Sequence, residues 1–126
     1  MSASTSTPKE VHPTGIVWKA EDIGGGGIID RSHVTVKLGP DDVANGSAGC
    51  NLYTAHYGLT DNRLTITGIT STEKACAPSL MQQEARYIAL LGRVVRWRIE
   101  PTGALVLTTA DGAPLRFFSD EPAPTR

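Results

Sequence analysis

A chain of 126 residues, of which 40% are hydrophobic, fits one domain with a single modest core. Its 12 basic and 13 acidic residues leave a net charge of −1, so no overall field attracts nucleic acid or an anionic membrane. The longest unbroken apolar run covers residues 87–91, far short of the roughly 18 residues that a membrane span needs. We therefore expect a small monomeric domain with no nucleic-acid partner and no transmembrane segment.

The two ends of the chain have the composition of flexible segments. Residues 1–14 are rich in Ser, Thr and Pro without periodicity, which predicts a tether. They contain neither a basic region nor an apolar run, so they are not a signal peptide; they fit a native cytosolic start or a mature chain whose export signal was replaced by Met. We expect the domain over 15–119 and a frayed tail over 120–126.

Short alternating segments open the predicted domain. Residues 15–20 are β-branched and aromatic and predict a first strand with Trp18 in the core. The four glycines at 24–27 lack the Gly-Lys-Ser/Thr ending of a phosphate-binding loop and are interpreted as a plain flexible loop. Alternation over 34–38 predicts a half-buried strand, and the turn residues 39–42 return the chain into the next strand from Val43.

The segment 46–57 combines two glycines, one of the two cysteines and two of the three tyrosines. We expect a tight bend at Gly49 and then a strand with Tyr53 and Tyr57 on the inner side. The amide of Asn51 is expected to hold backbone groups around the bend, with a ligand-reading role as the alternative.

The rest of the chain predicts a hairpin strand over 63–69, one helix over about 78–91 and three more strands. Pro78 suits the first turn of the helix and Gly92 its end. The fold class is therefore α+β: an antiparallel sheet that forms a half-open barrel of seven to eight short strands, with one helix inserted.

The residues that could carry chemistry are few. On a continuous strand Cys50 and His56 lie about 20 Å apart, which excludes a nucleophile–base pair unless the bend folds back. No metal-binding spacing is present, and no cofactor is indicated. Cys50 and Cys76 either form a disulfide, which would tie the bend to the segment entering the helix, or stay as two buried thiols.

Together these motifs resemble the META domain family, which includes the HslJ-like heat shock proteins. The likeness runs from about Gly15 to Phe118 and depends on the Gly-Cys-Asn-x-Tyr element followed by Thr-x-x-Ala-Cys, with Met81 and Glu84 in the helix. The positions that match the family motif as structural residues are Trp18, Gly46, Gly49, Asn51, Tyr53, Tyr57 and Glu84.

The resemblance implies a compact antiparallel β domain with one helix, found mostly in bacterial envelope proteins and often in lipoproteins. It implies a link to heat-shock response and novobiocin resistance, and no catalytic residues. We therefore expect a non-enzymatic domain that is periplasmic or anchored to the outer membrane, with a lipid anchor upstream as one means of attachment and an unidentified envelope protein as partner.

Two alternative functions remain open. The family fold also resembles the pilot lipoproteins of secretins, whose half-open barrels hold lipid. That likeness implies a hydrophobic ligand, for which the candidate lining residues are Trp18, Tyr53, Met81, Ile88 and Trp97. The second alternative is a cysteine-dependent enzyme, for which Cys50 is the candidate nucleophile.

Overall fold

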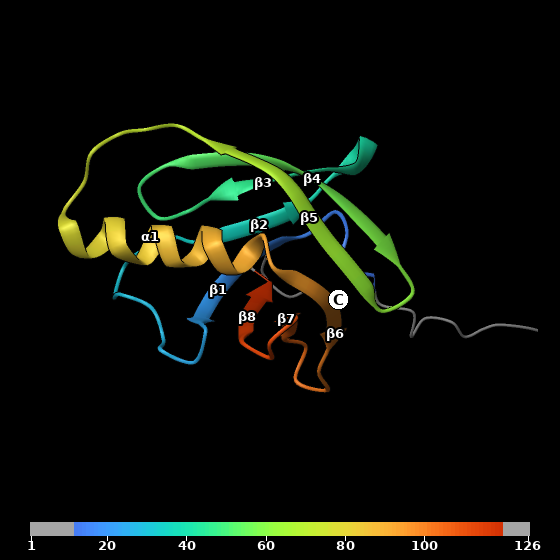
Figure 1. The fold of residues 1–126 in the computed structure, drawn as a ribbon. Coiled ribbons are helices and arrows are strands. Elements are labelled where there is room, and N and C mark those ends of the chain that lie inside the picture. The colour runs from blue at the N-terminus through green and yellow to red at the C-terminus, as the bar shows by residue number, and fades with distance from the viewer. Residues whose placement is uncertain (1–11, 120–126) are drawn as a thin grey trace, which may run out of the picture.

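Eight antiparallel strands follow one another around a closed barrel in the computed structural model, which describes residues 12–119 (Figure 1). Each strand pairs with the next along the chain, and β1 pairs with β8. The predicted antiparallel barrel with one inserted helix is confirmed. The elements are β1 (Val17–Ile23), β2 (Thr35–Leu38), β3 (Val43–Ser47), β4 (Leu52–Thr60), β5 (Arg63–Ser71), α1 (Pro78–Leu91), β6 (Val94–Ile99), β7 (Leu105–Thr109) and β8 (Pro114–Ser119).

The barrel is not joined equally well around its circumference. β1 and β8 pair along most of their length, from Trp18 opposite Ser119 to Ile23 opposite Leu115. β5 and β6 share one register position, Arg63 opposite Arg96, and α1 is inserted between these two strands. The opening expected for a half-open barrel is thus reduced to this narrow join.

The core fills the inside of the barrel and the space under α1. Along β4, Tyr53 and Ala55 are buried while Leu52, Thr54 and His56 are exposed, as the alternation predicts. The ring of Tyr87 on α1 lies between those of Tyr53 and Phe117, at centroid distances of 5.8 and 6.4 Å. The largest side chains of the core, together with Trp18, are Tyr53, Tyr87, Phe117, Ile23, Leu38, Leu64, Leu91, Leu105, Leu107 and Leu115.

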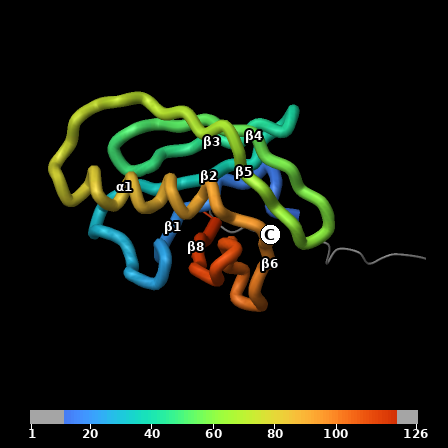
Figure 2. The backbone as a smooth tube through the Cα atoms, in the orientation of Figure 1, coloured from blue at the N-terminus to red at the C-terminus, as the bar shows by residue number. Residues whose placement is uncertain are grey.

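Helix α1 has the predicted bounds. Pro78 occupies its first turn, and the N–H of Gly92 donates to Ile88 O at 3.1 Å where the helix ends. The helix lies beside the loop that follows β1, and the arch between β5 and α1 carries the chain across to it (Figure 2). Within residues 12–119, no helix has the length and apolarity that a membrane crossing requires.

Of the two predicted domain boundaries, only the N-terminal one, at Gly15, has described residues on both sides. Residues 1–11 of the predicted tether and the predicted tail 120–126 lie outside the described residues. Pro13 is buried, accepts a hydrogen bond from the Trp18 indole N–H at 2.9 Å, and is followed by a bridge between Thr14 and Leu38. Packed structure therefore begins before Gly15, because the large indole of Trp18 holds the preceding residues.

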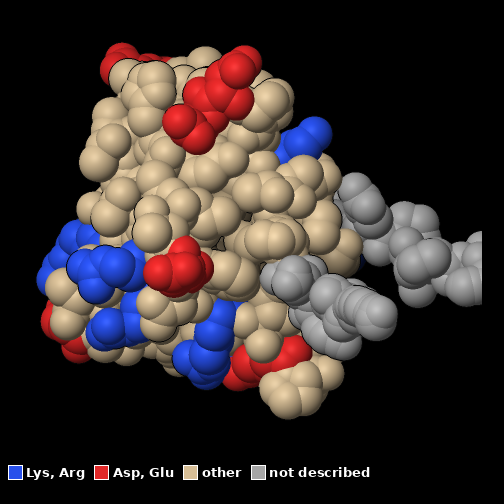
Figure 3. All heavy atoms as spheres, turned by 90° about the vertical axis from the view of Figure 1, so that its right-hand side faces the viewer, with Lys and Arg blue, Asp and Glu red and all other residues tan. Residues whose placement is uncertain are grey.

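Charges of both signs are mixed on the surface. On the face shown in Figure 3, Lys and Arg side chains gather in the lower half, with Asp and Glu side chains among them and along the upper edge. Among the surface ion pairs, Arg116 on β8 contacts Glu21 on β1 at 2.8 Å and Glu100 after β6 at 2.7 Å. Exposed pairs of this kind contribute little to stability each.

Candidate functional site

The bend between β3 and β4 carries the glycines of the family motif. Gly49 has a φ of +119°, a backbone conformation that residues other than glycine rarely adopt. Gly46 needs to be glycine for a different reason, because a Cβ there would overlap the carbonyl oxygen of Thr35 on β2. Ala48 N donates to Asn51 O at 2.7 Å and closes the bend.

The carboxylate of Glu84 on α1 holds this bend by hydrogen bonds. Its Oε1 accepts the backbone N–H groups of Cys50 at 3.1 Å and of Asn51 at 2.8 Å. Its Oε2 accepts the side-chain amide of Asn51 at 2.8 Å. Glu84 is 6% exposed and Asn51 1% exposed, so these hydrogen bonds lie away from water, where an unsatisfied carboxylate would be costly.

Asn51 also connects the bend to the chain that leads into α1. Its Oδ1 accepts Lys74 N at 2.6 Å and the Thr72 hydroxyl at 2.9 Å, and its Nδ2 donates to Lys74 O at 3.2 Å. Every polar atom of this side chain is therefore engaged with backbone or neighbouring side chains. Asn51 organises the local backbone, and its amide presents no unused group to a ligand.

Cys50 and Cys76 form a disulfide, with Cα atoms 6.3 Å apart, which confirms the first of the two alternatives for the cysteines. The bridge joins the bend to the residue two positions before α1. We call the assembly of Cys50, Asn51, Cys76 and Glu84 the bend clamp. In the bridged protein Cys50 carries no thiol that could act as a nucleophile.

The two tyrosines of the motif differ in environment. The hydroxyl of Tyr53 donates to Thr35 O at 2.7 Å and lies 2.8 Å from that of Tyr87, and burial raises the pKa of both tyrosines. Tyr57 is only half-buried, so it does not fill the core as expected but packs at its edge. Its hydroxyl donates to Gly39 O at 2.6 Å; burial, with a smaller effect of Asp42, raises its pKa.

The residues predicted to line an apolar ligand site lie in different places. Trp18 and Tyr53 are each 2% exposed within the packed core. Met81, Ile88 and Trp97 are half-buried, and the Trp97 indole N–H donates to Asp61 O at 2.8 Å at the end of the β4–β5 hairpin. None of the hollows described for residues 12–119 is lined by more than one of the five.

Other chemistry-bearing groups are not brought together. His56 lies on the exposed side of β4, away from the buried face that carries Tyr53. Among residues 12–119, no three His, Cys, Asp or Glu side chains are placed to bind one metal ion.

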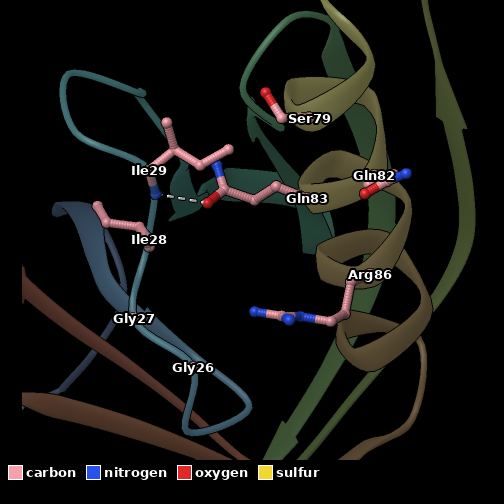
Figure 4. Close-up of a pocket in the computed structure, with 8 residues that line it drawn as sticks. All are labelled: Gly26, Gly27, Ile28, Ile29, Ser79, Gln82, Gln83 and Arg86. Atoms are coloured by element: carbon pink, nitrogen blue, oxygen red, sulfur yellow. Dashed lines mark hydrogen bonds between the residues drawn. The ribbon is translucent and has the colours of Figure 1, made fainter.

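A hollow of about 500 Å³ separates the glycine loop after β1 from α1 (Figure 4). We call it the α1 hollow. Gln83 joins its two walls, because Oε1 accepts Ile29 N at 2.8 Å and Nε2 donates to the Ser32 hydroxyl at 3.1 Å. Arg86 Nη2 donates to Ile23 O at 3.0 Å. The lining residues are Gly26, Gly27, Ile28, Ile29, Ser79, Gln82, Gln83 and Arg86.

The sequence reasoning did not find this hollow. The available signal was the spacing of Ser79, Gln83 and Arg86, which places three polar side chains on one face of a helix. The glycine run was interpreted as a plain loop, and it is one, but the Asp22 carboxylate organises it by accepting Gly25 N at 2.8 Å and Gly27 N at 2.6 Å. Which helix such a loop faces cannot be inferred from its own residues.

Comparison with known proteins agrees with this geometry. The model of the META domain family matches residues 12–122, and no protein with a curated description matches the chain. The NMR structure of a protein from Burkholderia xenovorans superposes with a TM-score of 0.70 at 20% identity, over 87% of this chain and 85% of that one. A second NMR structure gives a TM-score of 0.67 at 22% identity, over 86% of this chain and 94% of that one. The two structures support the fold, and the family match, which includes the bend clamp and Trp18, shows that the chain belongs to the META domain family.

Proposed function

We propose that this META domain is a non-enzymatic module of the bacterial cell envelope that supports heat-shock tolerance and novobiocin resistance through its surface. The observation that carries the proposal is the bend clamp. Within it, Asn51 and Glu84 are buried and hydrogen-bonded to each other, and Cys50 is bonded to Cys76, so the chemistry of these residues is used to hold the fold.

The state of the motif residues argues against catalysis. A general acid or base must reach the proton that it moves, yet Glu84 is 6% exposed and accepts three N–H groups. A cysteine nucleophile must be a thiolate, yet Cys50 is bonded to Cys76. These observations support a role in which the domain presents a stable surface to a partner.

The disulfide favours an envelope location. Structural disulfides persist in oxidising compartments such as the bacterial periplasm, whereas cysteines in the cytosol are kept as reduced thiols. A bridge across a sequence separation of 26 residues also stabilises the folded state against heat, in keeping with a role under thermal stress.

The proposal can be tested in a strain of the source bacterium from which the gene is deleted. The strain is complemented with the domain fused either to an export signal or to no signal, and survival after heat shock and growth in novobiocin are measured. We expect the exported form alone to restore tolerance. A deletion strain as tolerant as its parent, or full rescue by the form retained in the cytosol, would contradict the proposal.

Catalysis is tested with the double variant Cys50→Ala/Cys76→Ala, exported at a temperature where it stays folded. Because the proposed role needs the surface and not a thiol, this variant is expected to restore tolerance. Loss of function in the folded variant would instead favour a cysteine-dependent activity.

The lipid-binding alternative predicts a different measurement. Trp18 and Tyr53 close the core, so no room for an acyl chain is expected inside the barrel. Titration of delipidated protein with lysophospholipid, followed by tryptophan fluorescence, should give no saturable change. A saturable change would favour lipid binding.

A further inference from the structure

We propose that the α1 hollow binds a short, extended peptide that ends in a free carboxylate, with Arg86 as the residue that holds the carboxylate. This goes beyond the envelope role proposed above and does not depend on it, because the hollow would bind such a ligand in any compartment. The argument starts from how the walls are fixed.

Both walls of the hollow are held before any ligand arrives. Gln83 is 7% exposed and connects α1 to Ile29 and Ser32, which follow the glycine loop. On the loop itself, Asp22 holds the N–H groups of Gly25 and Gly27. A site with fixed walls loses little conformational entropy when it binds, which is the general advantage of preorganisation.

Arg86 supplies a positive charge that is oriented but not neutralised. Its Nη2 donates to Ile23 O at 3.0 Å, and the side chain extends from α1 towards the glycine loop (Figure 4). The ion pairs among the described residues do not include Arg86. The guanidinium has five N–H donors in a planar fork, so donors remain for a carboxylate after the contact with Ile23.

The glycine opposite Arg86 leaves the room for this arrangement. A Cβ at Gly26 would lie 3.1 Å from Arg86 Nη2 and 3.5 Å from Nη1, so the guanidinium would have to shift by a few tenths of an ångström. The absence of a side chain at position 26 therefore lets the guanidinium keep its place across the hollow.

The size of the hollow sets the length of the ligand. Ser79 and Arg86 are seven residues apart on one side of α1, or about 10 Å along the helix axis. Both side chains point towards the loop in Figure 4. An extended peptide advances about 3.3 Å per residue, so about three residues reach from Arg86 to the Ser79 hydroxyl.

The chemistry of the lining favours a peptide over a fatty acid or a bare phosphate. Ile28 and Ile29 offer apolar contact, while the Ser79 hydroxyl and the Arg86 guanidinium offer hydrogen-bonding groups along the same hollow. An acyl chain would leave those polar groups without partners, and an inorganic anion would use Arg86 alone. A peptide has alternating amides and side chains that suit a mixed lining.

The test is a titration of ¹⁵N-labelled protein with tri-alanine, followed by amide chemical shifts. We expect weak, saturable binding with shifts concentrated at residues 26–29 and 83–86. Tri-alanine amide, which lacks the negative charge, should bind about fivefold more weakly, since an exposed ion pair contributes up to about 1 kcal/mol. Inorganic phosphate and octanoate serve as the competing ligand classes.

Three variants separate the site from general effects on the protein. Arg86→Gln should lower the affinity for tri-alanine to that of the amide, and Gly26→Ala should weaken binding slightly by shifting the guanidinium. Arg63→Gln, which removes an exposed arginine elsewhere on the barrel, should bind as the wild type does. A dispersed spectrum of each variant verifies its fold.

Several results would overturn the proposal. These are the absence of saturable shifts in the hollow, equal affinities for tri-alanine and its amide, and unchanged binding in the folded Arg86→Gln variant. Binding of phosphate or octanoate at least as tight as that of tri-alanine would assign the hollow to another ligand class.

Discussion

Glu84 on α1 and Asn51 before β4 are 33 residues apart and share two hydrogen bonds of 2.8 Å, one from the Asn51 backbone and one from its side chain. Both side chains are buried. These hydrogen bonds tie α1 to the bend between β3 and β4 and so help to hold the helix against the barrel.

Replacement of Glu84 by glutamine is expected to destabilise the protein by about 2–3 kcal/mol, the range for losing a buried hydrogen bond to a charged group. The new amide would direct its own N–H₂ at the Asn51 amide or at the backbone N–H groups of the bend. Urea unfolding measures the change. Glu73→Gln removes an exposed carboxylate nearby and should leave stability unchanged; similar losses in both variants would contradict a specific role for Glu84.

The disulfide should contribute about 3–4 kcal/mol, from the chain-entropy model for the separation of 26 residues between Cys50 and Cys76. Cys50→Ser and Cys76→Ser are each expected to lower the melting temperature, and the double variant should be no worse than either single one. A reducing agent should lower the melting temperature of the wild type but not that of the double variant. Two alkylatable thiols in the natively expressed, air-exposed protein would contradict the bridge.

Gly46→Ala is expected to destabilise the protein by more than about 2 kcal/mol, because the new methyl group overlaps Thr35 O and forces β2 and β3 apart. The same oxygen accepts the Tyr53 hydroxyl, so the damage extends into the core. Thermal unfolding provides the measurement. Gly92→Ala is the control, because its Cβ would make ordinary contacts with Ile69 and Ile88, and an equal loss there would refute the steric argument.

Stability should decline at alkaline pH because of Tyr53 and Tyr87. Burial raises the pKa of both above the ordinary 10.0, so below pH 10 the folded and unfolded states are both protonated and the stabilising effect is fully present. Above pH 10 the unfolded state releases protons that the folded state keeps, and each tyrosine lowers the stability by about 1.4 kcal/mol per pH unit.

The measurement is urea unfolding at a series of pH values between 9 and 11. The variant Tyr53→Phe should be less stable at neutral pH, since it loses the hydrogen bond to Thr35, but should decline less steeply above pH 10. Tyr57→Phe should reduce the slope less, because Tyr57 lies at the edge of the core. An identical alkaline slope in Tyr53→Phe and the wild type would contradict this assignment.

Local pattern was sufficient to predict most of the barrel. The alternation along 52–57 placed Tyr53 inside and His56 outside, and Pro78 and Gly92 marked the ends of α1. These features depend on neighbouring residues alone, so a single sequence contains them.

The contacts across the fold could not be predicted in the same way. Glu84 matched the family motif, but its bonds to the bend depend on how the helix returns to the barrel after the arch that follows β5. Gln83 and Arg86 looked like an ordinary polar helix surface, because nothing in the helix indicates that the loop after β1 lies beside it. The register of β5 against β6, with Arg63 opposite Arg96, could not be inferred because like charges in register give no signal of pairing.

The single register position between Arg63 and Arg96 has a consequence for local unfolding. Strands joined by few hydrogen bonds separate at lower free energy than the rest of a sheet, and two facing guanidinium groups repel each other. Native-state hydrogen exchange should therefore begin along the facing edges of β5 and β6, and the barrel should open there as a sheet that stays paired from β6 through β8 and β1 to β5.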